Sequence, residues 1–249
     1  MQYHAFGPKD GKTLLLLHGG GLSWWSCREA AQLLQSEYRV LLPILDGHAG
    51  SGRPFTSIED CAANLIAWID RELGGSVLLI GGLSLGGQVL LEMLSRRGDV
   101  CRHALVESAT VLPSRLTHAL IGPSLACSYG LIRRRCFARL QFRSLRLKPE
   151  LFEEYYRDSS AISRADMTAF LRANTAYTLK DSIRSCAARV HVYAGGKELP
   201  GVLRSAERIH EAVPGSTLTV LPGLYHGDFS INHPADYAEA VRGIVRRNA

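Results

Sequence analysis

The sequence VLLIGGLSLGG occupies residues 77–87 and joins a short apolar run to a segment of helical character, QVLLEML at residues 88–94. This pattern predicts a buried strand that turns sharply into a helix at Ser84. Gly82 and Gly86 flank the serine, and such a turn needs small residues because its backbone segments come close together. The Ser84 hydroxyl would then project at the carboxyl end of the strand, beside the N-terminal amides of the helix. Short Gly/Ser patterns also occur in ordinary loops, so a nucleophile at this turn requires partners elsewhere in the chain.

Apolar runs and helical patterns alternate on both sides of this turn. Strands too apolar to expose either face, alternating with helices, predict an α/β fold with a mostly parallel sheet and helices on both faces. The apolar runs lie at residues 13–17, 39–44, 76–80, 104–106, 190–193 and 217–221, and the helical patterns at residues 27–35, 58–73, 87–96, 201–212 and 234–245.

The interval from Pro113 to about Arg189 interrupts the alternation. It contains no convincing strand and is typical of several helices, near residues 137–147, 149–157 and 167–174. An insertion at this place lies over the carboxyl ends of the strands, where open α/β folds bind their ligands. We therefore expect residues 1–249 to form a single domain with a helical cap at approximately residues 113–186.

Composition narrows the classes of function. Hydrophobic residues make up 46% of the chain and charged residues 21%, and the six cysteines include no Cys-x-x-Cys pair. We expect reduced thiols rather than disulfides or a metal site, and no metal or organic cofactor is implied. The chain has neither the features of a signal peptide nor an apolar run near the roughly 20 residues that span a membrane. These features favour a cytoplasmic protein without membrane association, and they leave the oligomeric state undetermined.

Basic residues are concentrated in the predicted cap, within a chain of net charge +6. A solvated helical face explains such a cluster, and attraction for an anionic substrate or a membrane surface is the alternative. Because no interleaved aromatic residues accompany the cluster, we do not expect nucleic-acid binding. The cluster comprises Arg133, Arg134, Arg135, Arg139, Arg143, Arg146 and Lys148.

Acyl transfer through a serine needs a general base and a group that orients this base. His226 is the candidate base, because it follows the last apolar run and precedes the last helical pattern. Glu198 is the candidate orienting acid and gives the order Ser84, Glu198, His226, which is the order of Gly-x-Ser-x-Gly hydrolases. Glu107 and Asp228 remain alternative acids, although Asp228 is too close to His226 in sequence to reach its ring well.

A glycine loop supplies candidate donors for a developing oxyanion. Residues 18–21, HGGG, follow an apolar run, and their exposed amides together with that of Leu85 are suited to hold a tetrahedral intermediate. Trp24 and Trp25 follow this loop and either line a substrate pocket or belong to the core. Gly21 and Tyr225 are further candidates for the pocket wall.

These motifs resemble the α/β-hydrolase superfamily over nearly the whole chain. The turn at Ser84, the loop at residues 18–21 and the sequence LDGHAGS at residues 45–51 carry the resemblance, and 28 residues separate Glu198 from His226. The resemblance implies Ser84 as nucleophile, His226 as base, Glu198 as acid, and an oxyanion hole formed by the amides of Gly20 and Leu85. Glu198 stands where members of this superfamily more usually have aspartate, and Leu83 stands where they often have histidine or glutamate. Because only twelve residues precede Thr13, we expect six or seven strands rather than eight.

The serine at the turn predicts an acyl-enzyme reaction, most simply with carboxylic esters of small or medium size. A carbon–carbon bond hydrolase, a lyase or a peptidase with the same three residues is an alternative. A non-catalytic ligand-binding protein on a hydrolase scaffold is a second alternative, of another class.

Overall fold

Seven strands form one sheet in the order β1-β3-β2-β4-β5-β6-β7 in the computed structural model, which describes residues 1–246. β1 runs antiparallel to β3, and every other neighbouring pair is parallel. The predicted α/β fold class, with a mostly parallel sheet of six or seven strands, is therefore confirmed. The strands are β1 (Tyr3–Phe6), β2 (Thr13–Leu17), β3 (Arg39–Pro43), β4 (Val77–Leu83), β5 (Cys101–Glu107), β6 (Arg189–Gly195) and β7 (Thr217–Leu221).

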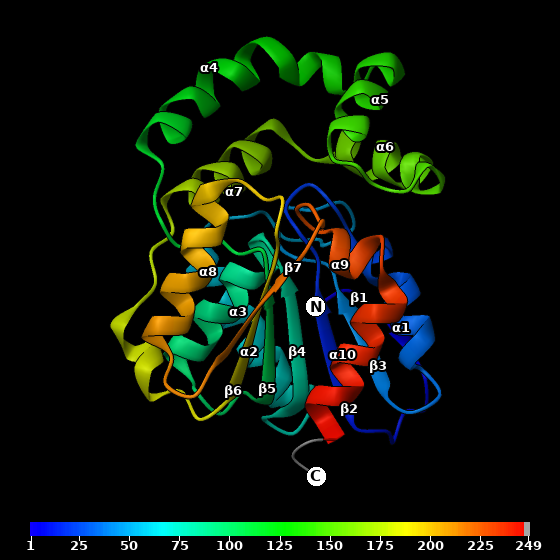
Figure 1. The fold of residues 1–249 in the computed structure, drawn as a ribbon. Coiled ribbons are helices and arrows are strands. Elements are labelled where there is room, and N and C mark those ends of the chain that lie inside the picture. The colour runs from blue at the N-terminus through cyan, green and yellow to red at the C-terminus, as the bar shows by residue number, and fades with distance from the viewer. Residues whose placement is uncertain (247–249) are drawn as a thin grey trace.

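Alternate residues of the central strands pack on opposite faces of the sheet. Leu14 and Leu16 belong to the core beneath α1 and α10, whereas Leu15 and Leu17 belong to the core beneath α2, α3 and α8. This double burial explains why the four residues of β2 after Thr13 are all leucine. Figure 1 shows these helices on the two faces of the sheet. They are α1 (Arg28–Leu34), α2 (Ile58–Glu72), α3 (Leu85–Arg96), α8 (Pro200–Ala212) and α10 (Pro234–Arg246), accompanied by the short elements η1 (Trp24–Cys27), η3 (Asp181–Ser185) and α9 (Asp228–Ile231).

The first strand has no counterpart among the apolar runs of the sequence. β1 has four residues at the edge of the sheet, and three of them are exposed. Its position depends on pairing with β3 and on the contact of the Tyr3 ring with Trp68, at 5.1 Å between ring centroids. An exposed edge strand needs no apolar face, so hydrophobic periodicity did not reveal it.

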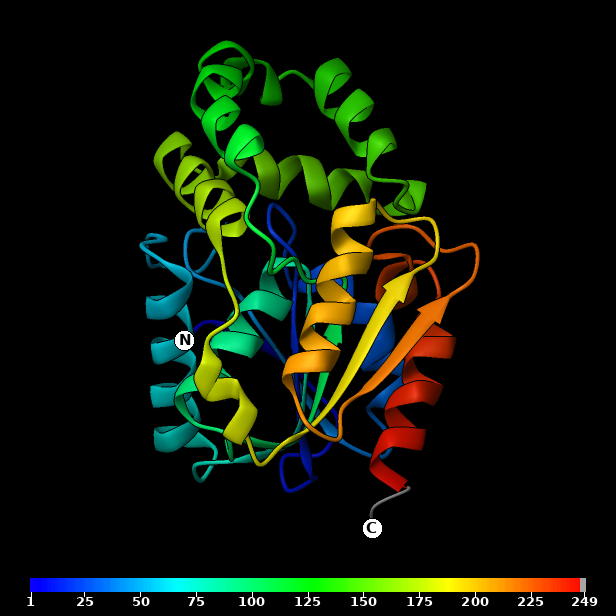
Figure 2. The ribbon, with the colours of Figure 1, turned by 60° about the vertical axis from the view of Figure 1, so that its left-hand side comes forward.

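Four helices between β5 and β6 form the inserted cap. Figures 1 and 2 show them stacked above the ends toward which the parallel strands point. The helices expected near residues 137–147, 149–157 and 167–174 correspond to α5, α6 and α7, and α4 is an additional helix of 18 residues. No helix within residues 1–246 has the length and apolar character needed to cross a membrane. The cap contains α4 (Arg115–Ile132), α5 (Arg135–Ser144), η2 (Pro149–Leu151), α6 (Phe152–Ala161) and α7 (Arg164–Ala176).

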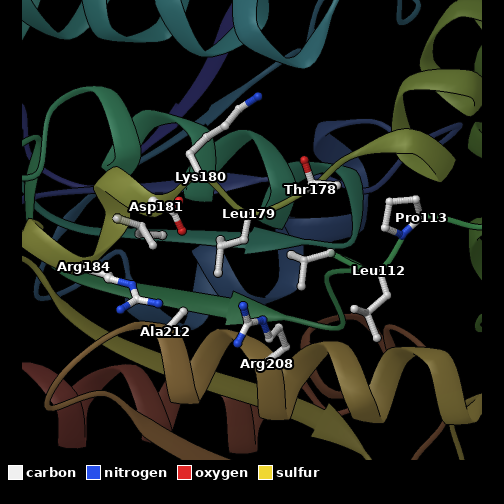
Figure 3. A pocket seen from close by; sticks show the side chains of 11 residues that line it. Leu112, Pro113, Thr178, Leu179, Lys180, Asp181, Arg184, Arg208 and Ala212 are labelled. Carbon is white, nitrogen blue, oxygen red and sulfur yellow. The ribbon is translucent and has the colours of Figure 1, made fainter.

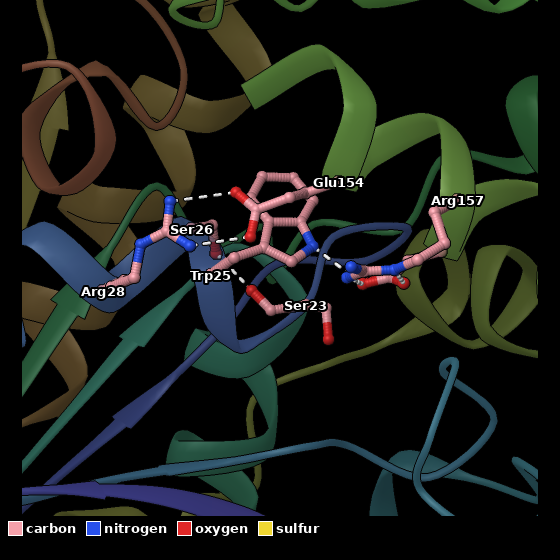
Figure 4. A network of polar contacts seen from close by, with 7 residues as sticks. Ser23, Trp25, Ser26, Arg28, Glu154 and Arg157 are labelled. Carbon is pink, nitrogen blue, oxygen red and sulfur yellow. Dashed lines mark hydrogen bonds and ion pairs between the residues drawn. The ribbon is translucent and has the colours of Figure 1, made fainter. Parts of the chain in front are cut away.

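Polar contacts attach the cap to the segment η1–α1 of the core (Figure 4). The guanidinium of Arg28 donates to both carboxylate oxygens of Glu154, at 2.7 and 2.9 Å. The indole N–H of Trp25 donates to Oδ2 of Asp158 at 2.9 Å. Bidentate and charge-assisted bonds of this kind fix orientation as well as distance, so they hold α6 in a defined position over the core.

Gln88 in α3 holds the two junctions of the cap together. Its amide Nε2 donates to the carbonyl oxygens of Thr110 and Asn174, at 2.7 and 2.9 Å, and its Oε1 accepts from Asn174 Nδ2 at 2.8 Å. The backbone amide of Ser114 also donates to the carbonyl of Thr175 at 3.0 Å. The cap therefore leaves and rejoins the core at neighbouring points.

Candidate active site

Ser84 lies at the turn between β4 and α3, with φ 51° and ψ −109°. A side chain at Gly82 would place its Cβ 2.5 Å from the carbonyl oxygen of Gly86, and one at Gly86 would lie 2.5 Å from the carbonyl oxygen of Leu17. Neither position has room for a larger residue. The amide of Ser84 donates to the carbonyl of Glu107 at 2.8 Å, which ties the turn to the neighbouring strand β5. A non-glycine residue held at positive φ stores backbone strain, and such strain concentrates at functional sites.

The structure brings Glu198 and His226 together. Glu198 follows β6 and His226 follows β7, and Nδ1 of the histidine donates to Oε2 of the glutamate at 2.7 Å. The other oxygen, Oε1, accepts from the Ser108 hydroxyl at 2.6 Å and from the Gly195 amide at 2.8 Å. The carboxylate is wholly buried, whereas 48% of the His226 side chain is exposed.

These hydrogen bonds determine the ionisation of the acid. Burial raises the pKa of Glu198, but the bonds from His226, Ser108 and Gly195 outweigh burial and hold that pKa below its usual value. An ionised Glu198 accepts the Nδ1–H of His226, so the neutral ring carries its proton on Nδ1. Nε2 is then left as the proton acceptor, which is the form that a general base requires.

Ser108 is a residue of this site that the sequence did not reveal. It directly follows the last residue of β5, has φ 55°, and donates its backbone amide to the carbonyl of Tyr193 at 2.9 Å. No motif marks it. Its position just beyond the carboxyl end of a strand beside β4 was the one available signal, since neighbouring parallel strands end at the same edge of the sheet.

Ser84 and His226 line the same cavity, which has a volume of about 170 Å³. The cap contributes Leu145 and Leu147 to it, and the core contributes mainly apolar or glycine residues. The wall can therefore accept a short apolar chain beside the serine. The full set is Gly19, Gly20, Leu22, Leu83, Ser84, Leu145, Leu147, His226, Gly227 and Ile231.

The four residues expected in the pocket wall lie outside it. Trp25 is 1% exposed and donates its indole N–H to Asp158, so it belongs to the contact between core and cap. The Trp24 ring stacks on His4 at 3.7 Å between centroids. The Gly21 amide donates to His48 Nε2 at 3.0 Å, and the Tyr225 ring lies under the guanidinium of Arg146.

The glycine loop lies against the start of α3. A Cβ at Gly20 would be 3.5 Å from the side chain of Leu85, the first residue of that helix. The first amides of a helix have no partner inside it, and the Gly20 amide forms no hydrogen bond with the chain over residues 1–246. These two amides therefore remain available at this edge, as an oxyanion hole requires.

His18 fixes this loop in place. Its Nδ1 donates to the carbonyl of Gly19 at 2.9 Å, and its Nε2 accepts from the amide of Leu45 at 3.1 Å. Complete burial is the main reason that its pKa falls to about 3, so His18 is neutral at physiological pH. Both of its ring nitrogens therefore bond to backbone groups and brace the loop.

The two alternative acids occupy other positions. Burial raises the pKa of Glu107 to about 7, and its Oε1 accepts from the Ser230 amide at 3.2 Å. Asp228 accepts from the Tyr225 amide at 2.7 Å and from Asn232 Nδ2 at 2.6 Å. Within the described chain, Glu198 is the carboxylate that bonds to the His226 ring.

A second cavity of about 230 Å³ lies away from Ser84 and His226 (Figure 3). It is formed by the segment after β5, the segment around η3 and helix α8, and Arg184 and Arg208 reach into it from the last two. Over residues 1–246, no three His, Cys, Asp or Glu side chains lie close enough together to hold a metal ion. This second cavity contains neither Ser84 nor His226, which meet in the cavity of about 170 Å³ described above.

Comparison with known families agrees with this geometry. The sequence profile of the alpha/beta hydrolase family matches residues 14–240, which is most of the chain. The chain belongs to the alpha/beta hydrolase family. Within this alpha/beta hydrolase, the match runs from β2 to α10 and includes the cap.

Solved structures share the fold of this hydrolase at low sequence identity. A thermophilic esterase from Thermogutta terrifontis superposes with a TM-score of 0.80 at 19% identity, covering 99% of this chain and 93% of the esterase. A bromoperoxidase from Bacillus anthracis superposes with a TM-score of 0.83 at 17% identity, covering 99% and 95% of the two chains.

The match to a curated relative is partial. The chain is 36% identical to the magnesium-chelatase 30 kDa subunit of Rhodobacter capsulatus over 91 residues, which are 35% of this chain and 31% of that protein. The alignment thus spans under a third of the relative's length.

Proposed function

We propose that this alpha/beta hydrolase is a serine hydrolase that acts through an acyl-enzyme on carboxylic esters of small or medium size. The observation that carries the proposal is the bond from His226 Nδ1 to the buried Glu198 Oε2, at 2.7 Å, with His226 and Ser84 lining one cavity. A nucleophile, a base and a group that orients the base are the parts that acyl transfer needs.

In the proposed reaction, His226 Nε2 accepts the proton of Ser84 Oγ as this oxygen attacks the ester carbonyl carbon. The amides of Gly20 and Leu85 donate to the oxyanion that forms, and Glu198 stabilises the imidazolium. The bond to the leaving alkoxide then breaks, and His226 gives it the proton. Water, deprotonated by His226, then attacks the acyl carbon, the bond from this carbon to Ser84 Oγ breaks, and His226 returns the proton to Oγ as the acid leaves.

The size and lining of the cavity support short or medium acyl chains. Its volume is about 170 Å³, and Leu22, Leu83, Leu145, Leu147 and Ile231 contribute apolar surface. An apolar wall favours an alkyl chain, because burying each methylene group stabilises the complex by about 0.8 kcal/mol.

The test is hydrolysis of p-nitrophenyl acetate, butyrate and octanoate by the wild type and by Ser84→Ala. We expect turnover by the wild type, greatest for one of the two shorter chains, and a loss of at least about 10³-fold in the variant. Equal rates for the two proteins would exclude Ser84 as nucleophile.

A folded wild type that neither hydrolyses these esters nor reacts with a fluorophosphonate probe would contradict the proposal and favour a ligand-binding protein. Labelling of Ser84 by the probe without ester turnover would instead favour a carbon–carbon bond hydrolase, a lyase or a peptidase.

A further inference from the structure

Two cations from different parts of the chain converge on the ring of Tyr225, the residue before His226. The guanidinium carbon of Arg146, in the cap, lies 3.9 Å from the ring centroid, and Nζ of Lys197, the residue before Glu198, lies 5.3 Å from it. Both distances are within the range of cation–π contacts. Positive charge is therefore gathered next to both the candidate base and the candidate acid.

The backbone of Arg146 is held in an unusual conformation. Its φ is 57°, and its carbonyl oxygen accepts from Asn232 Nδ2 at 2.8 Å. The same Nδ2 donates to Asp228 Oδ1 at 2.6 Å, and Asp228 Oδ2 accepts from the Tyr225 amide at 2.7 Å. These bonds connect the cap segment to the loop that carries His226. Arg146 follows Leu145, the C-cap of α5, and a left-handed residue at this position is a common way for a helix to end.

Arg146 also belongs to the segment that forms one edge of the candidate active site. Leu145 and Leu147, on either side of it, both line the cavity that contains Ser84 and His226. Arg146 itself does not line this cavity, so a substrate chain packed against these leucines would have to extend beyond the cavity to meet its guanidinium. We place the acyl chain of the proposed substrate in this cavity, so the acyl part is the one that extends toward Arg146.

The positive charges of Arg146 and Lys197 are not neutralised by the protein. Other basic residues of the cap form ion pairs, namely Arg135 with Glu153, Lys148 with Glu29, and Arg157 with Asp158. Over the part of the chain that the structure describes, neither Arg146 nor Lys197 has a carboxylate oxygen within 4.0 Å. Both residues are exposed, and an anion that bound near both charges would be attracted by each of them.

We propose that Arg146 and Lys197 bind a carboxylate at the far end of the substrate's acyl chain, so that the preferred substrates are half-esters of short dicarboxylic acids. This inference rests on the proposed ester hydrolysis and specifies its substrate class. It also explains why one arginine of the basic cap is fixed beside the site.

The test compares mono-p-nitrophenyl adipate with p-nitrophenyl hexanoate, two substrates of equal chain length that differ by one terminal carboxylate. We expect the wild type to favour adipate in kcat/KM at low ionic strength. The ratio of kcat/KM for adipate over hexanoate should fall about fivefold in Arg146→Gln and in Lys197→Gln, as expected for partly screened charges. Arg146→Lys, which keeps the charge, should retain a larger share of the ratio than Arg146→Gln.

Arg143→Gln is the matched control, because it removes the same charge three residues away in the same cap without touching Tyr225. Its ratio should equal that of the wild type, and added salt should lower the wild-type ratio. Ser84-dependent hexanoate hydrolysis with an unchanged ratio in folded Arg146→Gln and Lys197→Gln would overturn this inference alone. The absence of Ser84-dependent turnover of either ester would overturn the proposed function as well.

Discussion

The hydroxyl of Ser108 donates to Oε1 of Glu198 at 2.6 Å, whereas His226 bonds to Oε2 of the same carboxylate at 2.7 Å. Ser108 therefore stabilises the ionised acid without touching the histidine. It acts as a positioning residue, since it holds the group that in turn orients the proposed base.

Replacing Ser108 by alanine removes one of the bonds that hold the pKa of Glu198 below its usual value, so that pKa should rise. We expect kcat/KM for p-nitrophenyl butyrate to fall about tenfold or more, because hydrogen bonds to charged groups contribute about 1.5–3 kcal/mol. The acidic limb of the pH–rate profile should move to higher pH, as measured from pH 4 to 9. Ser108→Gly is the control for backbone strain at φ 55°; an intact rate in this variant would contradict a role for the hydroxyl.

Replacing Glu198 by glutamine should lower kcat by about 10²–10⁴-fold, because an amide can stabilise the wrong tautomer of His226. Asp228→Asn and Glu107→Gln should each retain most of the activity, since neither carboxylate bonds to the His226 ring within the described residues. The measurement is kcat for the same ester with all three variants. A large loss at Asp228 or Glu107 combined with a mild one at Glu198 would move the acid to that residue.

Glu107 should make the folded state less stable as the pH rises. Its pKa is about 7 when folded, against 4.5 for the ordinary carboxyl group, because burial disfavours the charged form. Between these two values the folded state binds more protons than the unfolded state, so the free energy of unfolding falls with pH by about 3 kcal/mol in total. Glu107→Gln should lack this loss and be the more stable protein at pH 8, as measured by urea unfolding at pH 5 and pH 8. Equal pH dependence in the two proteins would exclude a raised pKa.

Trp25→Phe removes the indole N–H that donates to Asp158 and leaves the packing of the ring largely in place. The free energy of unfolding should fall by about 1–3 kcal/mol, because a buried carboxylate oxygen loses a partner. Trp24→Phe serves as the matched control, since Trp24 makes a ring contact with His4 instead. Chemical denaturation of both variants provides the measurement, and an equal loss in the two would assign the effect to ring packing.

Local patterns in the sequence were sufficient for the parallel sheet, the strand–helix turn at Ser84 and three of the four inserted helices, but not for α4. Each of these depends on apolar periodicity or on glycine at a close approach, and both are visible within a short window. β1 was not predicted, because its pairing with β3, rather than its own apolar character, makes it a strand. The predicted bounds of the cap helices differ from the observed ones by several residues for a related reason. The ends of these helices depend on contacts with the core, such as that of Arg28 with Glu154.

Contacts between segments far apart in the sequence determine the remaining features of the site that could not be predicted. Ser108 bonds to Glu198 across 90 residues of sequence, and no motif records such a contact. The aromatic pair at Trp24 and Trp25 was compatible with a pocket or with the core, and only the packing of α6 decided that Trp25 faces Asp158. The wall of the cavity at Leu145 and Leu147 likewise depends on where the cap sits over Ser84.

The bonds from Gln88 to Thr110 and Asn174 also bear on how this fold diversifies. A segment whose two ends are already fastened beside each other can change in length at little entropic cost, because closure entropy grows only with the logarithm of loop length. We therefore expect that the whole insert can be exchanged while the strands keep their register and the turn at Ser84 keeps its shape. Residues 110 and 174 mark the boundaries at which a chimaera that carries the cap of another protein should be joined.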